Sequence, residues 1–240
     1  MVGFHAQLAR HKVQLYRLLI EILDDPQLTA VCRFKGGTCA AMRGFLDRFS
    51  VDLDFDLAPG HDQTIVEERL YSIFKKLDLE IKDKSQHVPQ FFLKYPASSG
   101  ARNTLKLDML PNQTNANKYD KAYLMDVDRY AMCQTRSTIF ANKLVAALDR
   151  FERNNTIAGR DIYDIHHFFL QGYAYDTAVI EERRGTTAAE YFQELLVFVE
   201  KQVTQTVINQ DLNVLLEPAR FQQIRKTLKT EVMMFLRSAM

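Results

Sequence analysis

The chain has 240 residues, of which 47% are hydrophobic and 25% are charged. These values describe an ordinary globular protein that is long enough for one large domain or two modest ones. The formal net charge of +1 excludes a general electrostatic attraction to nucleic acid, so a polynucleotide substrate would need a local basic surface.

The cysteines and the apolar segments exclude several further classes. Three cysteines without a C-x-x-C pair argue against a disulfide framework and a structural zinc site, and they fit a reducing cytoplasm. The N-terminus lacks a signal-peptide layout, and no apolar run approaches the roughly 20 residues that span a bilayer. The sequence therefore predicts a cytoplasmic protein with no membrane partner.

A helix, a short strand and a glycine turn are predicted first along the chain. Apolar residues keep helical spacing between residues 5 and 23, and Asp24-Asp25-Pro26 ends this helix. Residues 29–34 are predicted to form a short buried strand that leads into Lys35-Gly36-Gly37-Thr38, followed by a helix over 38–46. Because glycine lacks a Cβ, the backbone can approach a phosphate closely, and helix N–H groups near Thr38 would face the anion.

The next predicted strand, over residues 51–57, carries acidic residues at alternate positions. Asp52 and Asp54 leave one face, whereas Leu53, Phe55 and Leu57 enter a core. Two carboxylates a few Å apart repel each other unless a cation lies between them, and hard oxygen ligands suit magnesium. Simpler explanations stay open, because a Gly-Gly pair often marks only a turn and an acidic alternation is often the wet face of an edge strand.

A second acidic strand is predicted after a helix that Asp62 can cap and two short strands, at 79–82 and 90–95. Over residues 105–110 the alternation places Lys106 and Asp108 on one face. A third carboxylate on a neighbouring strand could orient or deprotonate an attacking hydroxyl in a two-metal mechanism. Asp108 is therefore a candidate base or metal ligand, and an edge strand facing water is the alternative.

The composition changes after the polar segment 112–117, and beyond residue 137 the periodicity is almost wholly helical. We predict an α+β protein with an α/β domain at 1–125 and a helical domain at 126–240. Lys143 lies beside the apolar stripe of its helix, where a lysine must snorkel or reach into a cleft. Asp161 and Asp164 lie one turn apart on the next helix, although Asp161 could equally serve only to stabilise the helix N-terminus.

Three motifs together resemble those of a known family. The stretch Gly36-Gly37-Thr38, a short helix and Arg48-x-Ser50-x-Asp52-x-Asp54 resembles the first motif of the DNA polymerase β-like nucleotidyltransferases. It resembles most closely the form found in the AbiEii/AbiGii-type abortive-infection toxins. Two later segments are similar to the third and fourth motifs of the same toxins: Lys143-Leu144-x-Ala146-Ala147-Leu148-x-x-Phe151 and Arg160-Asp161-x-Tyr163-Asp164. The likeness runs from about residue 34 to about residue 170, with Cys39 and Ala40 replacing bulkier apolar residues.

The resemblance implies a polymerase β-like nucleotidyltransferase domain with a mixed sheet, and a helical domain that contributes to the active-site cleft. The implied catalytic residues are Asp52, Asp54, Asp108, Lys143 and Asp161, the first three of which would also bind metal. The implied nucleotide-binding residues are Lys35, Gly36, Gly37, Thr38, Arg48, Ser50, Lys143 and Asp164. Arg48 could instead brace the acidic strand.

The same resemblance implies a toxin of a toxin–antitoxin or phage-defence pair, neutralised by a cognate antitoxin. Its reaction would transfer a nucleoside monophosphate from a nucleoside triphosphate to an acceptor, with Mg²⁺ as cofactor and Mn²⁺ as the alternative ion. Some members of the family add nucleotides to the 3′ end of tRNA, which makes tRNA the expected acceptor.

Two other functions stay open. The first is nucleotidylation of a protein or small molecule, because acceptor choice depends on loops and on the helical domain. The second is nucleotide or partner binding without turnover, although such proteins usually lose a carboxylate. The sequence of residues 172–240 predicts only amphipathic helices. This segment also contains a basic cluster, which is either a polynucleotide-binding surface or a solvated helix face: Arg220, Arg225, Lys226, Lys229 and Arg237.

Overall fold

A computed structural model describes residues 2–96 and 103–240, with side chains from residue 8 onwards. The chain divides into two compact units. The first contains residues up to 43 together with 50–113 and 119–134, and the second contains 44–49, 114–118 and 135–240. None of the helices in the described ranges is long and apolar enough to cross a lipid bilayer.

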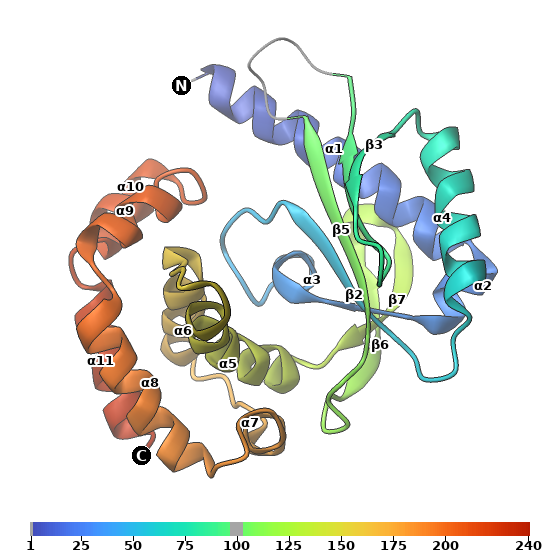
Figure 1. The fold of residues 1–240 in the computed structure, drawn as a ribbon. Helices are drawn as coiled ribbons and strands as arrows, with labels where there is room; N and C mark the ends of the chain where they lie inside the picture. Colours follow the sequence, from blue (N-terminus) through green and yellow to red (C-terminus); the bar gives the residue numbers. More distant parts are fainter. Residues whose placement is uncertain (1, 97–102) are drawn as a thin grey trace. The chain divides into compact units, whose positions relative to one another are not determined.

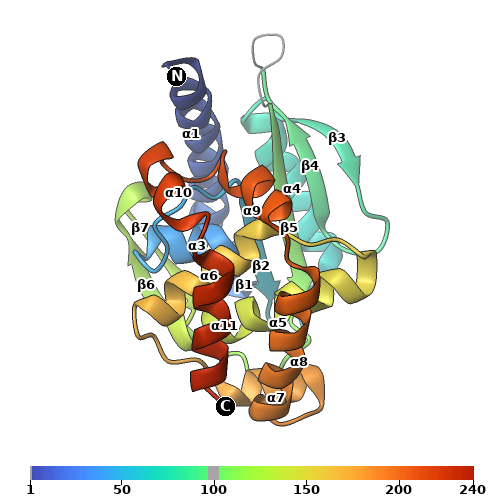
Figure 2. The same cartoon turned by 90° about the vertical axis from the view of Figure 1, so that its left-hand side faces the viewer.

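The first unit is built on a mixed seven-stranded sheet in the order β3-β4-β5-β2-β1-β7-β6. Figure 2 shows these strands side by side, with β3 and β6 at the two edges. The strands are β1 (Cys32–Lys35), β2 (Asp52–Leu57), β3 (Glu80–Lys84), β4 (Gln90–Lys94), β5 (Thr104–Pro111), β6 (Tyr119–Leu124) and β7 (Arg129–Gln134). The α+β class predicted from the sequence is confirmed.

The central strands hold the acidic residues in a fixed register. Strand β2 runs antiparallel to β1 and parallel to β5, so Lys35 lies opposite Asp54, and Asp54 lies opposite Asp108. Strand β4 runs antiparallel to β5 on its other side. Because directly paired residues in a sheet point to the same face, this register decides which polar side chains lie close together.

The two faces of the sheet are covered differently. Helices α1 (Val2–Asp24), α2 (Pro26–Val31) and α4 (Gln63–Lys76) lie over the apolar face, where the rings of Phe74 and Phe91 are 5.1 Å apart. Helix α3 (Gly36–Met42) packs against β1 and β2 on the opposite, acidic side. Figure 1 shows α2 and α4 on one side of the sheet and α3 on the other. A short 3₁₀ turn, η1 (Met125–Val127), connects β6 to β7.

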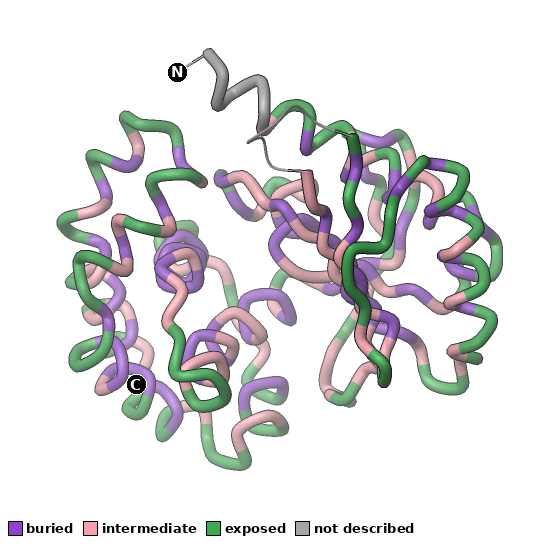
Figure 3. The backbone as a smooth tube through the Cα atoms, turned by 45° about the horizontal axis from the view of Figure 1, so that its top comes forward, coloured by how far each residue is buried: buried purple, intermediate pink, exposed green. Residues whose placement is uncertain are grey.

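The second unit is helical, as the resemblance implied for the C-terminal part. Its helices are α5 (Arg136–Asn154), α6 (Gly159–Leu170), α7 (Thr177–Arg184), α8 (Ala188–Gln202), α9 (Gln205–Leu212), α10 (Pro218–Ile224) and α11 (Leu228–Ser238). Helix α6 is buried along most of its length and is drawn mainly in purple in Figure 3. The rings of Phe140 and Phe168 meet at 5.0 Å in the core between α5 and α6.

The predicted strand at 29–34 is wrong in its first half. Residues up to Val31 belong to helix α2, because the Asp25 carboxylate caps it by accepting hydrogen bonds from the N–H groups of Gln27 and Leu28. Strand β7, which follows the predicted division at residue 125, pairs with β1 and β6 in the sheet of the first unit. The three cysteines are free and buried.

Candidate functional site

Three carboxylates share one face of the sheet in the first unit. Asp52 and Asp54 project from β2, and Asp108 projects from β5 directly opposite Asp54. The alternate residues Leu53 and Phe55 are buried on the other face, which fixes the direction of the acidic side chains. Burial, together with the charges of Asp52 and Asp108, raises the pKa of Asp54 to about 6, although nearby lysines act in the opposite direction. The face therefore concentrates negative charge that its own neighbours do not fully neutralise.

Asp108 has one paired and one unpaired oxygen. Its Oδ2 lies 2.5 Å from the ammonium of Lys106, two residues earlier on the same strand. Its Oδ1 is buried and accepts no hydrogen bond from any described residue. Because a buried carboxylate oxygen is costly without a partner, Oδ1 is suited to receive a cation or a proton from a ligand.

The glycine turn closes over this carboxylate face. Gly36 has φ of +76°, and a Cβ at this position would lie 2.4 Å from Oδ2 of Asp54. Only glycine fits both the left-handed backbone and the close approach. Gly37 and Thr38 are buried, and the Thr38 hydroxyl donates to the backbone oxygen of Asp52 at 2.5 Å. The hydroxyl thus ties α3 to the start of the acidic strand.

A third acidic residue of β2, Asp56, anchors the lysine before the turn. Its buried carboxylate accepts hydrogen bonds from Lys35 Nζ at 2.5 Å, from the Tyr119 hydroxyl at 2.8 Å and from Gln134 Nε2 at 2.8 Å. Three donors satisfy this carboxylate. Lys35 is therefore held at the edge of the acidic face, where its charge also lowers the pKa of Asp54.

The second unit contains a separate cluster around the fully buried Asp164. Its two oxygens accept bonds from Arg48 at 2.5 and 2.6 Å, and the ammonium of Lys143 lies 2.8 Å from Oδ2. Burial opposes ionisation of Asp164, but the two cations outweigh burial and lower its pKa to about 2. The cluster joins α5, α6 and the segment 44–49 through charge-assisted bonds.

The remaining predicted residues lie outside the hydrogen bonds described so far. Asp161 is buried one turn before Asp164 and pairs with Arg150 at 2.9 Å. Ser50 is half-buried just before β2. In the basic cluster at the C-terminal end, Lys229 donates to the backbone oxygens of Glu200 and Val203, at the last turn of α8. This lysine is therefore engaged in the fold of the second unit.

The part of the chain that the structure describes contains no preformed metal centre. Within residues 2–96 and 103–240, no group of three or more His, Cys, Asp or Glu side chains is arranged to hold a metal ion. Of the three carboxylates on the acidic face, Asp108 is already paired with Lys106. Mg²⁺, however, is usually held by only one or two protein carboxylates together with substrate phosphates and water, and Asp52 and Asp54 fit that requirement.

Sequence reasoning missed two residues of the acidic face. Lys106 and Asp56 belong to the two strands predicted from alternation, but the sequence analysis assigns neither residue to the site. The signal was the same alternation that identified the candidates, because Lys106 precedes Asp108 by two positions and Asp56 follows Asp54 by two. Neither pattern reveals which side chain pairs with which.

Comparisons with known proteins agree with the sequence motifs. A family model described as "Nucleotidyl transferase AbiEii toxin, Type IV TA system" matches residues 17–237. No curated protein matches the chain significantly.

Solved structures share the fold at low sequence identity. A candidate nucleotidyltransferase from Helicobacter pylori has a TM-score of 0.60 at 20% identity, over 96% of this chain and 93% of that one. JHP933 from H. pylori has a TM-score of 0.56 at 18% identity, over 97% and 93% of the two chains. MenT4, a nucleotidyltransferase toxin from Mycobacterium tuberculosis, has a TM-score of 0.55 at 17% identity, over 96% and 84%.

Proposed function

Because the chain belongs to the AbiEii family of nucleotidyltransferase toxins from type IV toxin–antitoxin systems, we propose that it transfers a nucleoside monophosphate to the 3′ end of tRNA. The donor is a nucleoside triphosphate, and the reaction depends on Mg²⁺, with Mn²⁺ as the alternative ion. The family implies a cognate antitoxin as partner, and we place the toxin in the cytoplasm, in a phage-defence role. The observation that carries the proposal is the acidic face, where Asp54 lies opposite Asp108 and under Gly36.

The proposed roles follow from the chemistry of each residue. Asp52 and Asp54 would hold the metal ion, which would supply positive charge to offset the negative charge that develops during in-line displacement. Asp108 is the candidate base, since its unpaired Oδ1 can accept a proton. The acceptor hydroxyl oxygen forms a bond to the α-phosphorus, the bond from that phosphorus to the bridging oxygen breaks, and pyrophosphate leaves.

The proposed nucleotide contacts come from the turn and from the sequence motifs. Lys35, Gly36, Gly37, Thr38 and Ser50 are assigned to the triphosphate in the first unit. Lys143 is assigned to the triphosphate because of its motif, and Asp161 is assigned a catalytic role for the same reason. Arg48 and Asp164 would support Lys143, since Asp164 bonds to both cations.

The test is incorporation of label into RNA. The purified protein is incubated with total tRNA, Mg²⁺ and each of the four α-labelled nucleoside triphosphates, and parallel reactions contain a chelator. We expect label in tRNA with wild type, and at least about a 1,000-fold loss with Asp54→Asn, because metal-assisted charge stabilisation is worth several kcal/mol. Glu68→Gln is the matched control, because Glu68 is exposed on α4, which covers the opposite face of the sheet, and the loss of its charge should leave the rate unchanged.

The outcomes separate the alternatives. An active, folded Asp54→Asn protein would refute the metal assignment. Label that enters a protein or a small molecule instead of tRNA would refute tRNA as the acceptor but would support the nucleotidyltransferase reaction. Metal-dependent nucleotide binding without any product would indicate a non-catalytic protein.

A further inference from the structure

The acidic face of the sheet continues onto strand β4, where its chemistry changes. In the register, Asp52 lies opposite Lys106 of β5, and Lys106 lies opposite Phe92 of β4. Lys94 lies opposite Thr104, two pairs further along the same two strands. Since neighbouring strands are about 4.8 Å apart, Phe92 lies about 10 Å from Asp52 across the sheet.

Phe92 occupies an unusual position for an aromatic ring. Its neighbours Phe91 and Leu93 are buried on the apolar face, whereas Phe92 is half-buried on the face that carries the carboxylates. The other two residues of β4 on this face are polar, Gln90 and the exposed Lys94. Phe92 is therefore not needed to fill the apolar core, and its ring remains accessible.

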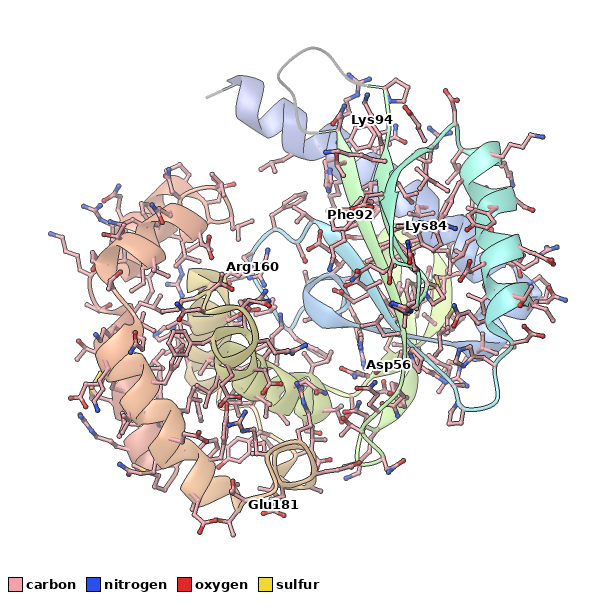
Figure 4. All side chains as sticks on the ribbon, viewed as in Figure 1. Asp56, Lys84, Phe92, Lys94, Arg160 and Glu181 are labelled. Atoms are coloured by element: carbon pink, nitrogen blue, oxygen red, sulfur yellow. The ribbon has the colours of Figure 1, made fainter. Side chains whose placement is uncertain are left out.

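Two lysines accompany this ring. The Lys106 ammonium lies 6.0 Å from the ring centre while it pairs with Asp108, so it links the ring to the carboxylates. Lys94 is exposed at the end of β4, and Figure 4 labels it together with Phe92. On the edge strand β3, Glu80 lies opposite Lys94 and Asp83 lies opposite Phe92, so two carboxylates border this surface on its outer side.

We propose that the β4–β5 surface, defined as Phe92, Lys94, Thr104 and Lys106, binds the terminal nucleotides of a single-stranded polynucleotide acceptor. A base stacks on Phe92, and Lys94 contacts a backbone phosphate. Aromatic platforms flanked by cations are the usual means of holding single strands without reading their sequence. The distance of about 10 Å to Asp52 corresponds to about three stacked nucleotides, so a strand on this surface can present its end to the carboxylates.

This inference rests on the proposed function, and it is tested first by binding without turnover. Fluorescence anisotropy is measured with an eight-nucleotide single-stranded RNA, labelled at its 5′ end, over a range of salt concentrations. We expect Phe92→Leu to raise Kd about tenfold without changing the salt dependence, because it removes stacking but no charge. Lys94→Gln should raise Kd severalfold and reduce the slope of log K against log salt by about 0.7, because one phosphate contact is lost.

Lys84→Gln provides the matched control. Lys84 lies on the neighbouring strand β3, but its ammonium contacts the hydroxyl of Tyr71 at 3.0 Å, on the side covered by α4. The variant loses the same charge as Lys94→Gln and should keep both Kd and the salt slope. Phe92→Trp retains a stacking ring and should bind at least as tightly as wild type, which separates loss of stacking from loss of fold.

Kinetics of transfer provide the second measurement. With wild-type protein that labels RNA, Phe92→Leu and Lys94→Gln should raise KM for the acceptor about tenfold and severalfold, with KM for the triphosphate unchanged. If both variants bind and react within twofold of wild type, the β4–β5 surface is refuted while the transferase stands. If wild type labels no RNA, the proposed function fails, and the binding data alone decide whether this surface holds a single strand.

Discussion

Asp54 in the first unit is half-buried and Asp164 in the second is fully buried, and their neighbours carry opposite charges. Asp54 faces Asp52 and Asp108, and burial together with these charges raises its pKa to about 6. Asp164 faces Arg48 and Lys143, and its pKa is lowered to about 2. The ionised form of aspartate is thus disfavoured at position 54 in the sheet and strongly favoured at position 164 in the helical unit.

The difference separates a site that requires a ligand from one that does not. Buried like charges destabilise a fold unless a cation joins them, so the acidic face is costly to the protein alone and is suited to a metal-bound substrate. The Asp164 carboxylate is already neutralised by two cations. Removal of this carboxylate should therefore lower the free energy of unfolding. Substitutions in the two regions should therefore change stability in opposite directions.

The largest change in stability is expected for Asp164→Asn. The variant leaves two cations with no compensating charge, one of them the buried Arg48, and breaking a buried pair in this way costs about 3–5 kcal/mol. Urea denaturation at pH 7.5 measures this loss. The control is Asp176→Asn, which loses a pair with the exposed Lys118 and should cost less than about 1 kcal/mol. Equal stability of the two variants would contradict a structural role for the buried cluster.

Asp54→Asn should have the opposite and smaller effect. In the presence of a chelator at pH 7.5, removal of the repelled charge should stabilise the fold by up to about 3 kcal/mol, since the pKa is raised from 3.8 to about 6 and one pKa unit corresponds to about 1.4 kcal/mol. Addition of Mg²⁺ should stabilise wild type but not the variant, because only wild type retains both Asp52 and Asp54. A variant that is less stable than wild type in chelator would show that Asp54 is not under electrostatic stress.

The same comparison predicts two pH dependences. Because the pKa of Asp54 is higher in the folded than in the unfolded chain, its contribution to stability is lost as pH rises through about 6. Because the pKa of Asp164 is lowered, its contribution is present above pH 4 and is lost as pH falls through about 2. Denaturation of wild type and Asp54→Asn between pH 4 and 7.5 measures the first, and the variant should show the weaker decline.

Local pattern explains what the sequence could predict. The alternation in β2 and β5 placed Asp52, Asp54 and Asp108 on one face, because side-chain direction in a strand depends only on position. The turn at Gly36 was recognisable because glycine has a distinct backbone preference. The strand predicted at 29–34 was half wrong because a capping aspartate extended a helix into it, and a strong cap outweighs weak β-propensity over three residues.

Long-range pairing explains what the sequence could not predict. Arg48 and Asp164 are 116 positions apart, and no local pattern connects them. The Asp56 carboxylate likewise depends on Tyr119 and Gln134 from the far end of the sheet. The bond between Lys106 and Asp108 is local, but alternation gives only a shared face and leaves the choice of partner to side-chain geometry.

The smallest change in stability tests how closely the glycine turn must approach Asp54. Gly36 and Gly60 have φ of +76° and +77°, but a Cβ at Gly60 meets nothing within 4 Å, whereas one at Gly36 lies 2.4 Å from Asp54 Oδ2. Alanine at either position pays about 1–2 kcal/mol for the left-handed backbone, so the difference between the variants isolates the contact. We expect Gly36→Ala to be about 1 kcal/mol less stable than Gly60→Ala, because Asp54 must shift to avoid the clash.

The effect of this shift on transfer should exceed its effect on stability. Displacement of a catalytic group by about 1 Å can cost about 100-fold in rate, so Gly36→Ala should lose that much activity while Gly60→Ala keeps the wild-type rate. Labelled-nucleotide transfer under saturating Mg²⁺ compares the two. If both variants transfer nucleotides equally well, Asp54 can move without penalty, and the acidic face would bind its ligand through Asp52 and Asp108 rather than through a position fixed by the turn.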